Sequence, residues 1–150
     1  MHEQAEIPHN TLVLVGDGRK ALFLRNQGAQ MNIKLEVERR LQHEAPPTRE
    51  MGTDRPGRTV SGPGDVRSAV EQTDWHQMEE DRFVDTIAGI LAREAAADPD
   101  LRIAIVLPPK ALGHLRAGMS AAVQKHVIAE IPKDLTHHPI PEIARHLRSQ

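Results

Sequence analysis

Residues 49 to 67 hold the side chains of this sequence that are best suited to binding a phosphate group. Four arginines lie in this short stretch, with Asp54 and Gly57 among them. A guanidinium group binds a phosphate through two parallel hydrogen bonds, and glycine lets the backbone approach a ligand closely. These residue types are compatible with contact to RNA or another phosphate; the alternative is that acidic neighbours pair with the arginines and order the segment. The candidate binding residues are Arg49, Asp54, Arg55, Gly57, Arg58 and Arg67.

Other kinds of chemistry find less support. The chain has no cysteine, which excludes thiolate metal sites, disulfides and cysteine nucleophiles. Its nine histidines include the adjacent pair His137 and His138, whose side chains diverge. Neither the pair His114 and His126 nor the pair His137 and His146 has the i, i+4 spacing of a compact helical metal site. No serine lies in a nucleophile elbow, and no glycine-rich nucleotide loop is present. We therefore expect no metal, no cofactor and no catalytic residue.

Composition limits the class of protein. The 150 residues carry a net charge of -2 and are 39% hydrophobic, which suits a single domain with one core and no overall attraction to nucleic acid. Only three aromatic residues are present, too few for a surface on which several bases stack. No apolar stretch approaches the roughly 20 residues of a membrane span, and the first ten residues are polar. We expect a cytoplasmic protein that does not insert into a membrane.

The first half of the chain is predicted to contain three antiparallel strands followed by a long loop. Apolar runs at 11–15 and 21–24 flank an Asp-Gly pair, the strongest short signal for a hairpin, and residues 31–37 alternate apolar and polar side chains. Residues 46–66 are rich in proline and glycine and almost without apolar side chains. A loop of this length inside a compact domain is unusual, which makes it the first candidate for a functional surface.

The second half is predicted to alternate helices and strands. Asp74 and Gln77 resemble a capping box, and an apolar stripe follows to about residue 96, which predicts a helix over 75–96. The apolar runs at 101–107 and 127–131 predict two strands joined by a short helix, and residues 140–147 predict a C-terminal helix.

This order predicts an α/β domain in which helices flank a mixed five-stranded sheet, a ribonuclease-H-like layout with the order βββαβαβα. The domain is expected to span residues 11–150, after a flexible segment of residues 1–10. Asp17 lies close to where ribonuclease-H-like enzymes hold a metal-binding carboxylate. That chemistry needs several carboxylates, and the strand at 101–107 offers none. We interpret Asp17 as a turn residue.

Three stretches carry a resemblance to a known family: residues 54–58 (Asp-Arg-Pro-Gly-Arg), residues 107–116 and residues 133–136. Their order and spacing resemble the bacterial host attachment protein family, whose members are similar to the central domain of the archaeo-eukaryotic peptide-chain release factors. The resemblance covers about residues 10–148. We expect the motif residues outside the long loop to be structural, namely Pro108, Pro109, Leu112, Gly113, Leu115, Arg116, Lys133, Asp134 and Leu135.

The resemblance has two functional implications. In the release factors, the loop between the third strand and the first long helix bears the Gly-Gly-Gln tripeptide that promotes hydrolysis of peptidyl-tRNA. Residues 46–66 lack this tripeptide, so we expect a non-enzymatic, translation-associated domain that contacts the ribosome or tRNA through this loop. The alternatives are attachment to host cells through a protein or surface partner, and a nucleic-acid hydrolase, which the missing carboxylates disfavour. The sequence does not indicate an oligomeric state.

Overall fold

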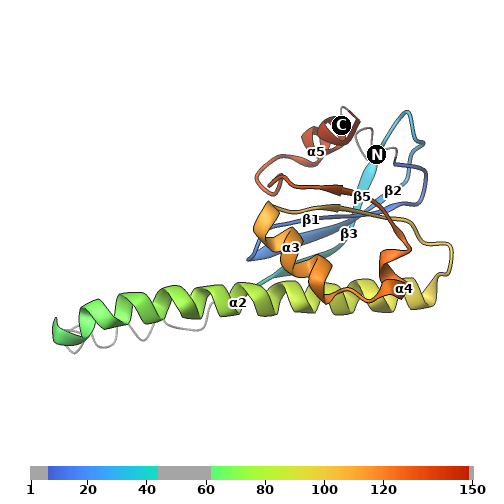
Figure 1. Cartoon of the computed structure of the whole chain (residues 1–150). Helices are drawn as coiled ribbons and strands as arrows, with labels where there is room; N and C mark the ends of the chain where they lie inside the picture. Colours follow the sequence, from blue (N-terminus) through green and yellow to red (C-terminus); the bar gives the residue numbers. More distant parts are fainter. Residues whose placement is uncertain (1–6, 44–61, 149–150) are drawn as a thin grey trace.

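The computed structural model describes residues 7–43 and 62–148, with the backbone alone described for 62–74. Its centre is a five-stranded sheet in the order β3-β2-β1-β4-β5 (Figure 1). Strand β1 pairs antiparallel with β2 and parallel with β4, and the pairing of β4 with β5 is also parallel. The predicted mixed sheet is confirmed. The strands are β1 (Leu12–Gly16), β2 (Lys20–Asn26), β3 (Leu35–Gln42), β4 (Ile103–Val106) and β5 (Val127–Ile131).

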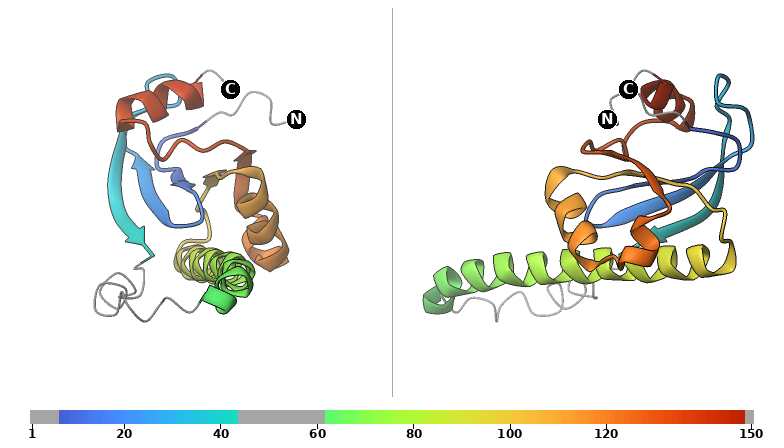
Figure 2. Two further views of the ribbon diagram at one scale, coloured as in Figure 1. Left: turned by 90° about the vertical axis from the view of Figure 1, so that its left-hand side faces the viewer. Right: turned by 45° about the vertical axis from the view of Figure 1, so that its right-hand side comes forward.

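Helices cover both faces of the sheet, as predicted. They are α2 (Gly62–Ala97), α3 (Pro109–Gly118), α4 (Ala121–Gln124) and α5 (Ile140–Arg148). On one face α2, α3 and α4 bury a core around Leu14, Ile87 and Ile105, and on the other α5 buries a second core around Val13, Val106 and Leu147 (Figure 2). None of the helices, as far as the chain is described, is both long and apolar enough to cross a bilayer.

Helix α2 begins 13 residues before its predicted start at residue 75, so the prediction of a loop through residue 66 is wrong for residues 62–66. Asp74 lies inside the helix and does not cap it. The Gly62-Pro63 pair opens the helix because proline's fixed φ suits the first turn, and residues 65–74 contain neither glycine nor proline to interrupt it. The N-terminal third of α2, residues 62–74, projects past the sheet, and we call it the α2 extension (Figures 1 and 2).

Strand β3 begins later than its alternating pattern predicts. Met31 is 84% exposed and belongs to a turn that is closed by hydrogen bonds between Ala29 and Asn32. The strand starts at Leu35 and runs on through charged residues to Gln42. A strand at the edge of a sheet tolerates such charges, which also discourage pairing with a second chain.

The chain is already packed at Ile7, so the predicted flexible segment of residues 1–10 is wrong for residues 7–10. The Ile7 side chain is fully buried, and the Asn26 side chain donates a hydrogen bond of 2.8 Å to the Ile7 carbonyl. The backbone amide of Asn10 donates to the carbonyl of Asn26 at 2.7 Å. These bonds hold the start of the domain against the end of β2.

Candidate functional site

Four strand ends meet at one edge of the sheet. Strands β1, β3, β4 and β5 run in the same direction, because β1, β4 and β5 are mutually parallel and β3 returns antiparallel to β2. We call the side where they finish the carboxyl edge, made of the residues that follow the four strands: Asp17, His43, Leu107 and Pro132. Ligands of open α/β sheets bind at edges of this kind, because loops rather than packed elements meet there.

The arginine-rich segment is joined to the domain at the carboxyl edge. The amide of His43 donates a hydrogen bond of 2.7 Å to the Arg19 carbonyl in the β1–β2 turn, so the chain leaves β3 beside that turn. It re-enters the described structure at Gly62, the start of the α2 extension, which projects on the same side (Figures 1 and 2). Arg49, Asp54, Arg55, Gly57 and Arg58 lie outside the described residues. Arg67 lies on the α2 extension, and its side chain is not among those described.

A small pocket of about 120 Å³ at the carboxyl edge shows how tightly the neighbouring segments approach one another. Gly18 of the β1–β2 turn, Pro108 and Lys110 at the start of α3, and Glu80 of α2 all contribute to its lining. A Cβ atom on Gly18 would lie 2.9 Å from the Glu80 side chain, so glycine is what permits this approach. The pocket is too small for a ligand of drug size, which needs roughly 300 Å³ or more.

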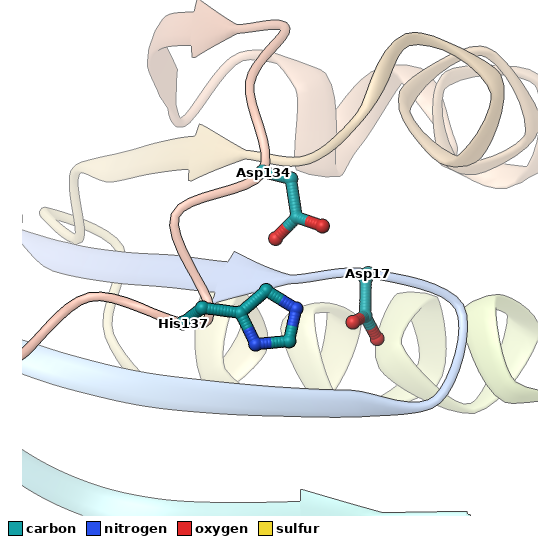
Figure 3. Close-up of side chains that lie close together, drawn as sticks. All are labelled: Asp17, Asp134 and His137. Carbon is teal, nitrogen blue, oxygen red and sulfur yellow. The ribbon is translucent and has the colours of Figure 1, made fainter.

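Asp17, Asp134 and His137 meet at the carboxyl edge (Figure 3). Asp17 directly follows β1, whereas Asp134 and His137 lie in the connection between β5 and α5. One ligand atom from each residue, a carboxylate oxygen or an imidazole nitrogen, lies within 4.8 Å of those from the other two. Asp17 is partly exposed and the other two side chains are exposed. These three residues, which we call the Asp-Asp-His cluster, are the group in the described part of the chain that could hold a metal ion.

Local hydrogen bonds orient both carboxylates of the cluster. Asp17 Oδ1 accepts from the amides of Arg19 and Lys20 at 2.7 and 2.9 Å, which confirms the predicted turn role. Asp134 Oδ1 accepts from the amide of Thr136 at 3.0 Å. The Thr136 hydroxyl lies between the carboxylates, 2.5 Å from Asp134 Oδ1 and 3.4 Å from Asp17 Oδ2.

The surroundings of Asp134 favour its ionised form. Partial burial by itself raises the pKa of Asp134, but the two hydrogen bonds from Thr136 and the nearby charges of His137 and Lys20 outweigh burial and hold the pKa below its ordinary value. At neutral pH the cluster therefore presents a carboxylate as a ligand.

The motif residues near the carboxyl edge divide into packed and exposed groups. Leu112, Leu115 and Leu135 are buried, and Pro108 and Pro109 set the start of α3. Arg116 forms an ion pair with Glu130 of β5, which ties α3 to the neighbouring strand. Gly113 has open space around its Cα, and Lys133 and Asp134 are exposed.

Sequence reasoning missed the meeting of Asp17 with Asp134 and His137. Asp17 and Asp134 are 117 positions apart in the sequence. Only the parallel arrangement of β1, β4 and β5 brings the ends of β1 and β5 to one edge. A usable signal was present, because each aspartate lies within three residues of the end of a predicted strand. The spacing of the histidines from one another says nothing about their distance from the carboxylates.

Comparison with known proteins identifies the family. Residues 10–147 match bacterial archaeo-eukaryotic release factor family 12. The match confirms the predicted likeness to release factors and does not support the predicted likeness to host attachment proteins. A search among curated proteins finds no match to the chain. Because the match extends over nearly the whole chain, from before β1 into α5, the protein belongs to bacterial archaeo-eukaryotic release factor family 12.

Proposed function

We propose that this domain contacts the ribosome or tRNA through residues 46–66 and the α2 extension, and does not hydrolyse peptidyl-tRNA. Family membership supports a role in translation. The observation that carries the choice of surface is that β3 ends and α2 begins on one side of the sheet, with α2 continuing past the carboxyl edge (Figure 1). The arginine-rich segment therefore joins the domain at the end of a projecting helix.

The chemistry of this surface suits the phosphate backbone of RNA. Residues 46–66 contribute Arg49, Arg55 and Arg58, and Arg67 follows on α2. The whole chain has a net charge of -2, so attraction to RNA has to be local to such a surface. Contacts of guanidinium groups with phosphates release counterions, and the resulting affinity falls steeply with salt.

Co-sedimentation with ribosomes at increasing salt tests this proposal. The variant Arg55→Glu/Arg58→Glu should lower the affinity at least about tenfold, because two phosphate contacts become repulsive. Its matched control is Arg93→Glu/Arg102→Glu, which makes the same change in charge near the end of α2 and just before β4, away from the carboxyl edge. Failure of the wild-type protein to co-sediment, indifference to salt, or an equal loss in both variants would reject the proposal.

A release assay on programmed ribosomes tests the second half of the proposal. Residues 46–66 contain no Gly-Gly-Gln; Pro56 has no backbone N–H to donate, and Arg58 stays protonated and cannot serve as a base. The nearest glutamine that follows, Gln72, lies within α2. We expect peptidyl-tRNA to remain intact with the wild-type protein bound. Release of peptide that disappears in Arg58→Ala would show that the domain is an enzyme.

A further inference from the structure

We propose that the Asp-Asp-His cluster is a binding site for a divalent transition-metal ion. The juxtaposition of Asp17, Asp134 and His137 at the carboxyl edge carries this inference, which does not rest on the proposed contact with RNA. The three residues come from two loops that the fold brings together, and they supply two carboxylates and one imidazole. This is a mixed ligand set and differs in that respect from an ordinary patch of surface acids.

The distances within the cluster are close to those that a shared metal ion requires. Bonds from a metal to nitrogen or oxygen are about 2.1 Å long, so two ligand atoms on one ion lie roughly 3 to 4.3 Å apart. The ligand atoms of the cluster all lie within 4.8 Å of one another. The exposed side chain of His137 can rotate toward the two carboxylates without movement of the backbone.

The backbone around the cluster is held in place. Leu135, between the two ligands of the β5–α5 connection, is only 3% exposed and packs in the core beneath α5. The amide of His138 donates to the Leu135 carbonyl at 3.1 Å and closes the turn that carries His137. Across the site, the amides of Arg19 and Lys20 fix the Asp17 carboxylate. Ligands whose positions are already fixed lose little conformational entropy when a metal binds.

Hydrogen bonds from nearby amides and from the Thr136 hydroxyl orient the two carboxylates of the cluster. Each aspartate uses Oδ1 to accept from amides of its own turn, and this fixes the direction in which Oδ2 points. The Thr136 hydroxyl donates to Asp134 Oδ1 and also reaches Asp17 Oδ2. In known metal sites, hydrogen bonds of this kind orient the ligating carboxylates and tune the affinity for the metal.

The ligand types select the class of ion. Imidazole suits zinc and several other first-row transition metals, and carboxylates also suit manganese, whereas Mg²⁺ and Ca²⁺ prefer oxygen ligands alone. Three protein ligands also leave further coordination positions open for water or a phosphate oxygen. Lys20 opposes cation binding, because its charge is close enough to act on Asp134. We therefore expect preference for Zn²⁺ or Mn²⁺ over Mg²⁺ with moderate affinity.

Isothermal titration of the tag-free, full-length protein with Zn²⁺ and Mn²⁺ tests the site, with Mg²⁺ as the comparison. We expect one equivalent of Zn²⁺ or Mn²⁺ to bind, and each of Asp17→Asn, Asp134→Asn and His137→Ala to weaken binding at least about tenfold. The asparagine at position 17 or 134 can still accept the bonds of the turn, so these variants keep the backbone in place. Melting curves without metal check that each variant folds.

Two control variants make the result specific. Asp100→Asn removes an exposed carboxylate near the start of β4, and His138→Ala removes the imidazole next to His137. His138 is the sharper control, because its ring packs against that of His146 with centroids 4.9 Å apart, so the variant tests whether this pair of imidazoles binds the ion instead. Binding that persists in both controls and is lost in the three cluster variants supports the proposal. Absence of stoichiometric binding, equal binding of Mg²⁺, or loss in His138→Ala with retention in His137→Ala would overturn it.

Discussion

Replacing Asn26 with alanine should be among the most costly single changes in this domain. Asn26 is fully buried at the end of β2. Its Nδ2 group donates to the carbonyls of Ile7, Pro8 and Ala29 at 2.8, 3.2 and 3.3 Å, and its Oδ1 atom accepts from the amides of Gly28 and Lys34 at 2.9 and 3.0 Å. The side chain thus joins the N-terminal segment to the β2–β3 turn.

The size of the effect follows from these contacts. The two hydrogens of Nδ2 serve three carbonyls, so the side chain makes the equivalent of four hydrogen bonds. Each contributes about 1 kcal/mol net, and partners left buried without a bond cost more. Some partners lie only partly buried and regain water when the side chain is removed. We expect Asn26→Ala to lower the free energy of unfolding by about 3 to 4 kcal/mol.

Urea unfolding followed by circular dichroism measures this loss. Asn32→Ala is the matched control, because Asn32 lies in the same turn with an exposed side chain. A loss below about 1 kcal/mol at an unchanged m-value would refute the reasoning, since it would mean that water replaces the network at little cost.

Asn26→Asp provides a test with a defined sign. The introduced carboxylate still accepts from the two amides but faces three carbonyl oxygens, so the folded state favours its protonated form and raises its pKa above that in the unfolded chain. The protonated form restores a donor. The deficit relative to wild type should therefore be largest near pH 7 and shrink as the pH falls to about 4.

Two further substitutions probe the core and the helix. Ile105→Ala removes a fully buried side chain from β4 and should cost about 2 to 5 kcal/mol; a fall in melting temperature no larger than that of exposed Lys125→Ala would contradict the central placement of this strand. Gly89→Ala should stabilise α2 by about 0.5 to 1 kcal/mol, because a Cβ there meets nothing within 4 Å, whereas Gly28→Ala should destabilise the protein, since its Cβ would lie 2.1 Å from the Asn32 carbonyl. A loss of stability in Gly89→Ala would indicate a contact on that face of the helix.

Patterns of local sequence predicted the sheet well. The strand at Val127–Ile131 appears with its predicted bounds, since an apolar run stopped by Pro132 leaves little ambiguity. Ile103–Val106 is central and buried on both faces, as a continuous apolar run indicates. Leu22 and Val37, which belong to the apolar run at 21–24 and the alternating stretch at 31–37, are only partly buried, because β3 is the edge strand and β2 is its neighbour.

Features set by distant partners escaped prediction. The early start of α2 has no apolar stripe to indicate it, because residues 62–74 include only Val66, Ala69 and Val70 as apolar side chains besides glycine and proline. The role of Asn26 depends on carbonyls of residues 18 and 19 positions earlier in the chain. The Asp-Asp-His cluster likewise depends on topology, since no local pattern connects residue 17 with residue 134.

Because α2 projects past the sheet, a small change in the tilt of this helix moves its N-terminal tip by a larger distance. At 1.5 Å per residue, the stretch of α2 from Gly62 to Phe83 forms an arm of about 32 Å, so a tilt of about 5° at Phe83 displaces its tip by roughly 2.7 Å. The pivot is the stretch where Phe83, Ile87 and Leu91 are clamped in the core. A change in packing by a single methylene at this pivot would cause a larger displacement at the far end of the arm, at Gly62. The position of the helix tip relative to the sheet is therefore determined by packing in the core. Substitutions of buried residues that contact no partner should shift this position before they unfold the protein.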